Sequence, residues 1–259
     1  MADLKIRILL KKIDSFFNMT MKVICIIPAR GGSKGLKSKN LRKVNNRPLI
    51  YYPIKAAIKS RSCDKICVST DSPRIAKIAK NFGAEVPFLR DKKFSEDLTT
   101  TEETLKNALL SFEKYYKCKF DICVFLTCTN LFRKVSWIKK AVNILKKNKK
   151  YESAFSVHEM YKHFWHKKNN NFFKVSKWMN TYTSRQIGNK IYREDTGLAL
   201  ASRSYLWRKG KRIGNKNYFI INNDPLTGID IHNIHDLKLA EFAMKYLIKN
   251  NLATDMILK

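Results

Sequence analysis

The feature that most constrains the fold of this chain is an apolar segment that runs directly into a glycine-rich loop. Residues Val23–Ile27 are apolar without interruption, which predicts a buried strand. Gly31, Gly32 and Gly35 follow, and we expect them to turn the backbone with positive φ and to let it approach a ligand closely. Loops of this kind present backbone N–H groups to anions. The segment therefore predicts a strand that ends in a polyphosphate-binding loop.

The same loop carries several fixed positive charges. Arg30, Lys34, Lys37 and Lys39 supply cations and Ser33 supplies a hydroxyl, so the loop can neutralise several phosphate charges together. Its spacing excludes the two commonest phosphate-loop patterns, because neither G-x-x-x-x-G-K-[ST] nor G-x-G-x-x-G occurs in it. The loop is thus a candidate nucleotide site of another class.

From Met21 onward, strand patterns alternate with helix patterns, which predicts an α/β fold with a doubly wound, mostly parallel sheet. A capping box of Asn233 and Asp236 predicts a last helix that extends through Leu247. The expected strands cover residues 22–27, 65–70, 85–89, 120–126 and 153–157, and the expected helices cover 49–60, 73–82, 102–116 and 134–148.

Polar residues follow the predicted strands, where open parallel sheets bind their ligands. Arg30, Asp71, Arg90 and Thr127 each come just after a predicted strand. We therefore expect one cleft to collect the glycine loop, these side chains, Asn40 and the distant Asp230.

Residues 158–195 interrupt the alternation and predict an inserted β-arm. The stretch from His158 to Asn180 is rich in His, Trp, Phe, Lys and Asn and has no clean period. Exposed aromatic residues are best explained by burial against a partner, so we expect a homodimer. The expected division is an N-terminal extension at 1–20, one domain at 21–250 that includes this arm, and a tail at 251–259. A membrane-visiting amphipathic helix is the alternative for residues 1–20.

Charge and cysteine content narrow the classes of function. The net charge of +31 is spread over the whole length, whereas a nucleic-acid footprint would concentrate it in one stripe or tail. The six cysteines form no C-x-x-C pair and no zinc spacing, which favours a reduced, cytoplasmic compartment. No apolar run approaches the length of a membrane span.

The loop resembles the signature of the CMP-N-acetylneuraminate synthetase (acylneuraminate cytidylyltransferase) family, A-R-G-G-S-K-G followed by K-N. Residues Arg30–Asn40 carry the match, and the resemblance covers roughly residues 21–248. Further matches follow in the family's order at Val68–Ser72, Gly83–Arg90, Asp97, Thr99–Thr101, Arg185-Gln186, Tyr192-Arg193, Gly197 and Ile229–Ile231. We expect Asp97 to cap its loop rather than to act in catalysis.

The resemblance implies a Rossmann-like nucleotidyltransferase fold with a small dimerisation arm, and a reaction of CTP with a 2-keto sugar acid. It implies that Arg30 and Lys34 act on the phosphates in catalysis, and that Arg185 pairs with the sugar carboxylate. It also implies Mg²⁺ or Mn²⁺ at Asp230, where His232 would lie on the same side of a strand. The implied nucleotide-binding residues are Arg30, Gly31, Gly32, Ser33, Lys34, Asn40, Arg90 and Thr101, and the implied sugar-binding residues are Thr127, Arg185 and Arg193.

Departures from the family pattern concentrate on the sugar side. Thr127 replaces a glutamine, Leu200 replaces a tyrosine, and His232 replaces the second acidic residue of Asp-Ile-Asp. Such a pocket favours a modified nonulosonic acid of the pseudaminic or legionaminic type over sialic acid. Two alternatives stay open: another sugar nucleotidyltransferase with a different base or a sugar phosphate, and a nonenzymatic, basic nucleic-acid-binding protein.

Overall fold

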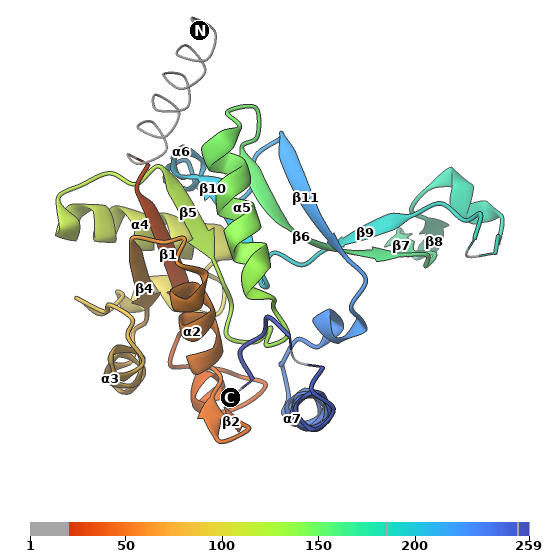
Figure 1. The fold of residues 1–259 in the computed structure, drawn as a ribbon. Coiled ribbons are helices and arrows are strands. Elements are labelled where there is room, and N and C mark those ends of the chain that lie inside the picture. The colour runs from red at the N-terminus through yellow and green to blue at the C-terminus, as the bar shows by residue number, and fades with distance from the viewer. Residues whose placement is uncertain (1–20, 185, 253, 259) are drawn as a thin grey trace, which may run out of the picture.

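The computed structural model describes residues 21–184, 186–252 and 254–258. These residues form a seven-stranded central sheet with helices on both faces (Figure 1). The strands of the sheet are β1 (Val23–Pro28), β4 (Lys65–Ser69), β5 (Ile122–Phe125), β6 (Ser153–Met160), β9 (Ile191–Glu194), β10 (Leu200–Arg203) and β11 (Asn217–Asn222). The short hairpins are β2 (Lys43–Val44) with β3 (Arg47–Pro48), and β7 (Trp165–Lys168) with β8 (Asn171–Lys174). The α-helices are α2 (Tyr51–Ser60), α3 (Pro73–Asn81), α4 (Thr101–Tyr116), α5 (Val135–Lys147), α6 (Ser204–Arg208) and α7 (Ile234–Lys249). The 3-10 turns are η1 (Lys39–Leu41), η2 (Lys92–Phe94), η3 (Lys177–Asn180) and η4 (Pro225–Gly228).

The strand order is β11-β6-β10-β5-β1-β4, with β9 added beside β6. β1 runs parallel to both β4 and β5. β10 is antiparallel to both β5 and β6, so β6 runs in the same direction as β5, and β11 is parallel to β6. The strands β11, β6, β5, β1 and β4 therefore share one direction, and the prediction of a mostly parallel sheet is confirmed.

Helices bury their apolar stripes against the two faces of this sheet. Along β1, Cys25 and Ile27 belong to a core cluster with α2, α3, α5 and α7, whereas Ile24 and Ile26 belong to a second cluster with α4 and α6. The alternation follows from the two-residue period of a strand. Because both faces are covered, β1 is apolar at every position, and the predicted doubly wound α/β fold is confirmed.

Two helices begin at capping boxes. Thr100 and Glu103 cap α4, and Asn233 and Asp236 cap α7 as predicted, each pair exchanging side-chain and backbone hydrogen bonds. Replacing such a cap by Ala costs about 0.5–2 kcal/mol. The cap of α4 fixes the start of the helix just after Thr100, which places Thr101 at the carboxyl edge of the sheet.

The expected strand at 85–89 is wrong. Only a bridge between Cys67 and Glu85 forms, in which the Glu85 N–H donates to Ile66 O and the Val68 N–H donates to Glu85 O. The next donor in a parallel ladder would be residue 87, which is Pro87 and has no N–H. The strands β10 and β11 and the helix α6 were not anticipated by the sequence analysis.

The inserted segment projects from the body as an arm (Figure 1). Its base is the outer half of β6, where residues Val157–Met160 pair with β9. The hairpin of β7 and β8 and the turn η3 follow beyond that pair. The arm is therefore an extension of a central strand, and its expected boundary at residue 158 falls inside β6.

The C-terminal segment packs against the domain. Met256, Ile257 and Leu258 are buried, and the Val135 N–H donates to Asp255 O at the start of α5. The extension expected at residues 1–20 lies outside the described residues. Within the described part of the chain, no helix is both long and apolar enough to cross a membrane.

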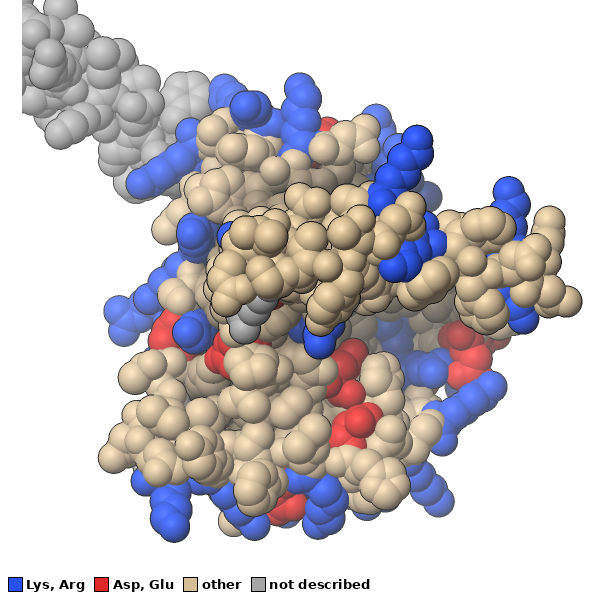
Figure 2. All heavy atoms as spheres, turned by 90° about the vertical axis from the view of Figure 1, so that its right-hand side faces the viewer, with Lys and Arg blue, Asp and Glu red and all other residues tan. Residues whose placement is uncertain are grey.

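Basic side chains are scattered over the face of the molecule seen from the arm side. Figure 2 shows Lys and Arg at its edges and across its middle, with a few Asp and Glu between them. The charge of +31 does not gather into a single stripe on this face.

Candidate active site

The glycine loop after β1 is held against two neighbouring segments. The Gly31 N–H donates to Asp71 Oδ1 at 2.8 Å, just beyond the end of β4. A Cβ at Gly31 would lie 3.1 Å from Ser72 Cβ, and one at Gly35 would lie 2.6 Å from the carbonyl oxygen of His232. Two of the loop's glycines are thus needed because other parts of the chain approach closely.

The expectation of positive φ at these glycines is wrong. Among the described residues, the glycines with positive φ are Gly83 and Gly210, and in the loop it is Ser38 that takes φ 55°. Close packing rather than a left-handed backbone accounts for Gly31 and Gly35. Gly32 has no atom within 4 Å of an added Cβ.

The two expected catalytic cations share one carboxylate. Asp97 accepts from Arg30 Nη1 at 2.9 Å and from Lys34 Nζ at 2.7 Å. The hydrogen bond from Lys34, followed by that from Arg30, lowers the pKa of Asp97. The side chain expected to cap a loop is therefore the counter-ion of both cations. All three groups are partly exposed, so incoming phosphates can displace the carboxylate.

A cleft of about 460 Å³ lies at the carboxyl edge of the sheet beside this cluster. Arg90 is only 6% exposed in its wall, its Nε donates to Ser95 Oγ at 2.9 Å, and burial lowers its pKa. Asn40 Nδ2 donates to Arg30 O at 3.0 Å and ties the loop to η1. The lining brings together the predicted residues Arg30, Ser33, Lys34, Asn40, Arg90, Thr101, Thr127 and His232, whereas Gly31 and Gly32 lie outside it.

A second pocket of about 380 Å³ adjoins the cleft. Thr101, Phe125, Thr127 and Thr129 line both cavities, so the two cavities lie side by side. The second pocket adds the predicted residues Arg193 and Asp230, together with Asn130, Glu194, Asp195, Thr196, Gly197, Arg212, Thr227 and Gly228.

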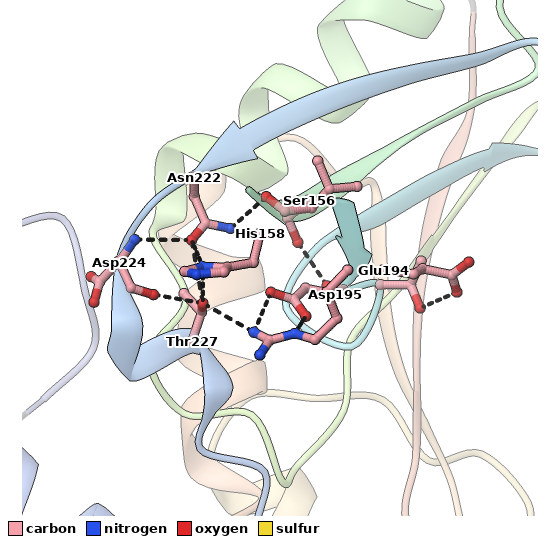
Figure 3. A network of polar contacts seen from close by, with 10 residues as sticks. Ser156, His158, Glu194, Asp195, Asn222, Asp224 and Thr227 are labelled. Atoms are coloured by element: carbon pink, nitrogen blue, oxygen red, sulfur yellow. Dashed lines mark hydrogen bonds and ion pairs between the residues drawn. The ribbon is translucent and has the colours of Figure 1, made fainter. Parts of the chain in front are cut away.

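A polar network that includes Asp195, Ser156, His158 and Thr227 (Figure 3) fixes Arg193 of β9. Its Nε and Nη2 donate to the two carboxylate oxygens of Asp195 at 2.7 and 2.9 Å, and these bonds raise the pKa of Arg193. Ser156 Oγ donates to Asp195 O at 2.7 Å. Thr227 Oγ1 lies 3.5 Å from Arg193 Nη2 and 3.3 Å from His158 Nδ1. Side chains of β6 and η4 that the sequence analysis missed thus orient the sugar-side arginine.

A buried arginine, Arg133, joins the loop of Thr127, which lines both cavities, to the loop of Gly197, which lines the second. Its Nη2 donates to Thr127 O at 2.6 Å and to Gly197 O at 2.9 Å, and its Nε donates to Leu198 O at 3.0 Å. The side chain is 1% exposed, and burial lowers its pKa to about 10. The sequence analysis missed it, because Lys134 follows directly and nothing in the sequence distinguishes the buried cation from the partly exposed one.

Asp230, in the lining of the second pocket, has one uncommitted carboxylate oxygen. Its Oδ2 lies 3.0 Å from His232 Nε2, and its Oδ1 is buried without a hydrogen-bond partner among the described residues. Lys39 lies nearby, where burial lowers its pKa and the Asp230 charge opposes that shift. The strand expected through these residues is wrong, since residues 229–231 have no regular structure. The side chains of Asp230 and His232 nevertheless lie close together, as expected.

Asp230 Oδ1 fits one ligand position of a divalent cation, which favours carboxylate oxygens. No group of three His, Cys, Asp or Glu able to hold a metal occurs among the described residues. Further ligands would therefore come from substrate oxygens and water, as is usual for Mg²⁺. Arg185, expected on the sugar side, lies outside the described residues.

A model of the family described as "Cytidylyltransferase" matches residues 24–210, which is more than half of the chain. The chain belongs to the cytidylyltransferase family. The resemblance found in the sequence is therefore confirmed, and the protein is a nucleotidyltransferase. It is 32% identical over 225 residues to the post-translational flagellin modification protein B of Campylobacter coli, covering 86% of this chain and 95% of that protein. It is 33% identical over 224 residues to the CMP-N,N'-diacetyllegionaminic acid synthase of Campylobacter jejuni, covering 85% and 94%.

Solved cytidylyltransferases share the fold. The structure of CMP:2-keto-3-deoxy-manno-octonic acid synthetase complexed with CTP matches with a TM-score of 0.63 at 14% identity, covering 87% of this chain and 99% of that one. At this identity the match supports the architecture of the cytidylyltransferase and not the roles of its side chains.

Proposed function

We propose that this cytidylyltransferase transfers CMP from CTP to the anomeric hydroxyl of a nonulosonic 2-keto sugar acid and releases pyrophosphate, for use in surface glycans. The observation that carries the proposal is the adjacency of two cavities that share Thr101 and Thr127 in their linings. One cavity is lined by the cations of the glycine loop and the other by a paired arginine and a carboxylate. This division suits a nucleotide on one side and a sugar acid on the other.

In the proposed reaction, the oxygen of the anomeric hydroxyl attacks the α-phosphorus of CTP, and the hydroxyl proton passes to water. A new O–P bond forms while the bond from the α-phosphorus to the bridging oxygen breaks, and pyrophosphate leaves with that oxygen. Arg30 and Lys34 exchange Asp97 for phosphate oxygens and stabilise the charge that grows on the leaving group. No covalent intermediate on the protein is required.

Asn40, Arg90 and Thr101 read the cytosine and its ribose. Asn40 and Arg90 are almost buried, at 7% and 6% exposure, and each already holds one contact within the protein. Side chains fixed in this way present their remaining donors without a large loss of rotamer freedom. On the other side, Thr127 and Arg193 contact the sugar acid, and we assign its carboxylate to Arg185.

Asp230, with its uncommitted Oδ1, would hold Mg²⁺ or Mn²⁺, with His232 beside it. Such a cation neutralises phosphate charge and aligns the reacting oxygens.

We further propose that the arm at residues 158–195 joins two protomers. Phe172 of β8 is 65% exposed and Trp165 of β7 is 57% exposed, and burial against a second copy would remove this apolar surface from water. Light scattering on a Phe172→Ser/Phe173→Ser variant should report a monomer. Phe242→Ser on α7, which also changes an exposed aromatic residue, should leave the dimer intact. A variant of the hairpin that stays dimeric would contradict the proposal.

The reaction is tested by pyrophosphate release from purified protein with each of four nucleoside triphosphates and a panel of acceptors. The panel contains N-acetylneuraminic, legionaminic, pseudaminic and 2-keto-3-deoxy-manno-octonic acids. We expect turnover with CTP and a nine-carbon acid, with the CMP-sugar identified by mass spectrometry. Turnover with another nucleotide alone, or only with a sugar 1-phosphate, would replace the proposed reaction.

A further inference from the structure

We propose that Asn130 selects the acceptor sugar: its side-chain amide Nδ2 donates a hydrogen bond to an oxygen of the sugar acid, and Thr127 holds the amide in the required orientation. The inference rests on the proposed function and names a specificity residue for it. It begins at the hydroxyl of Thr127, a residue that lines both cavities.

The orientation of the Asn130 amide follows from the single proton of the Thr127 hydroxyl. Thr127 Oγ1 lies 2.6 Å from Asn130 Oδ1 and 3.1 Å from Gly197 O. Gly197 O already accepts from the Thr127 N–H at 3.0 Å and from Arg133 Nη2 at 2.9 Å. The hydroxyl proton is therefore directed to Asn130 Oδ1, because a carbonyl oxygen has two lone pairs and both of those on Gly197 are engaged.

The accepted bond turns the amide so that Nδ2 points away from Thr127. Asn130 lines the second pocket and not the cleft that holds the glycine loop, whereas Thr127 lines both. Nδ2 has no hydrogen-bond partner among the described residues, since the contact of the side chain with Thr127 uses only its oxygen. The loop thus presents one uncommitted amide donor on the sugar side.

Tight packing keeps this arrangement rigid. A Cβ at Gly197 would overlap Asn130 Oδ1 and would lie 2.7 Å from Thr127 Oγ1, so a larger residue there would displace the Asn130 and Thr127 side chains from this contact. Arg133 fixes the backbone on both sides of the contact through its bonds to Thr127 O and Gly197 O. Residues held in this way keep a donor in place before the ligand arrives, which is the condition for discrimination.

The surrounding pocket indicates what the donor recognises. Arg193 is paired with Asp195, and Arg212 is paired with Glu102 and Glu194, so the pocket's guanidinium donors are largely engaged. The amide of Asn130 is itself uncharged, so a neutral oxygen of the substrate can pair with it without leaving a buried charge uncompensated. An acylamino carbonyl or a hydroxyl oxygen of the sugar acid is such an oxygen, and a sugar without it leaves the amide unpaired.

The test is Asn130→Asp, which keeps an oxygen to accept from Thr127 and replaces the amide donor by a charged oxygen, with the uncharged Asn130→Ser as the second variant. We expect kcat/KM for the preferred sugar acid to fall by about 10- to 100-fold, the usual loss when one buried hydrogen bond is left unmade. KM for CTP should stay within about twofold, because the nucleotide lies in the other cavity. Asn143→Asp, an exposed position on α5, introduces the same charge and is the matched control.

Two further measurements separate recognition from a structural effect. Thr127→Val removes the orienting hydroxyl at nearly constant volume. In the Thr127→Val/Asn130→Asp double variant, the loss of kcat/KM for the sugar acid should be smaller than the product of the two single losses, because both changes disturb the same contact. Acceptors that lack one acyl or hydroxyl oxygen should be poor substrates for the wild type. The acceptor that lacks the oxygen bound by Asn130 should lose no further kcat/KM when Asn130 is replaced. Asn130→Ser serves if the Asp variant does not fold.

Unchanged sugar kinetics in both Asn130 variants, or equal losses for CTP and sugar acid, would overturn this inference alone. A wild-type protein that turns over none of the acceptors would overturn both the inference and the proposed function.

Discussion

The carboxylate of Asp97 lies 2.7 Å from the ammonium of Lys34 in the cleft. It therefore pairs with a cation that is expected to bind phosphate. The same carboxylate contacts Arg30, so in the proposed reaction the triphosphate displaces it from both cations. A single acidic side chain therefore competes with the triphosphate for the loop.

Replacement of this competitor should strengthen nucleotide binding. Asp97→Asn is expected to lower KM for CTP by about two- to fivefold at low salt, since exposed ion pairs are individually weak and are screened by salt. The effect should shrink as the salt concentration rises. Asp91→Asn, which removes a carboxylate that pairs with Lys93 on the same segment, is the control. A higher KM for CTP in Asp97→Asn would show that Asp97 helps to bind the nucleotide.

Removal of either loop cation should reduce turnover far more than stability. Arg30→Ala and Lys34→Ala are each expected to lower kcat by about 10²- to 10³-fold, as for the loss of one preorganised charge. The melting temperature should change little, because both side chains are partly exposed. Lys37→Ala removes a cation from the same loop, outside the lining of the cleft, and should be nearly silent. A double Arg30/Lys34 variant with normal turnover would contradict the proposed chemistry.

Metal dependence should respond to Asp230. Asp230→Asn is expected to raise the Mg²⁺ concentration for half-maximal rate by about tenfold or more, because a neutral amide is a weaker ligand than a carboxylate. The rate is measured over a magnesium titration at saturating CTP. Asp121→Asn, on a side chain that accepts from the Lys22 N–H, is the control. An unchanged titration would move the metal site elsewhere.

Stability at low pH should depend on Glu113. Burial raises its pKa, but hydrogen bonds from Arg208 and Lys119 outweigh that and lower it overall. A lowered folded pKa means that the stabilisation is complete above the unfolded value of about 4.3 and is lost as pH falls through the folded value. Glu113→Gln should therefore cost about 1–3 kcal/mol at pH 7 and progressively less below about pH 4, as measured by urea unfolding. A cost that does not vary with pH would refute the charge-based explanation.

Local patterns predicted the elements that position the nucleotide half of the site. The strand of Val23–Ile27 was readable because both faces are covered, and the last helix because Asn233 and Asp236 cap it. The expected strand at 85–89 failed at Pro87, where one missing N–H ends the ladder. The prediction of positive φ at Gly31 and Gly35 was wrong. These glycines are needed because residues distant in sequence pack closely against them and leave no room for a side chain.

The sugar half depends on contacts between residues far apart in sequence, which no local pattern contains. Arg133 reaches Gly197 across 64 positions, and Ser156 reaches Asp195 across 39. The antiparallel strand β10 lies between β5 and β6. Its pairing with these two strands forms only when the whole sheet assembles, so the local sequence does not reveal it. The contact between Thr127 and Asn130 spans three positions but was invisible, because the sequence does not show which way a side-chain amide turns.

The continuity of β6 from the sheet into the arm limits how this protein can vary through evolution. Ser156 and His158 point to the polar network of Arg193, whereas Phe155 and Val157 point to the apolar core. An insertion or deletion of one residue within β6 would exchange these two faces and would lose both sets of contacts together. Beyond Met160 the hairpin can lengthen, shorten or change its sequence without that penalty. Diversity among such arms should therefore accumulate at the tip, while the length of the strand beneath it stays constant.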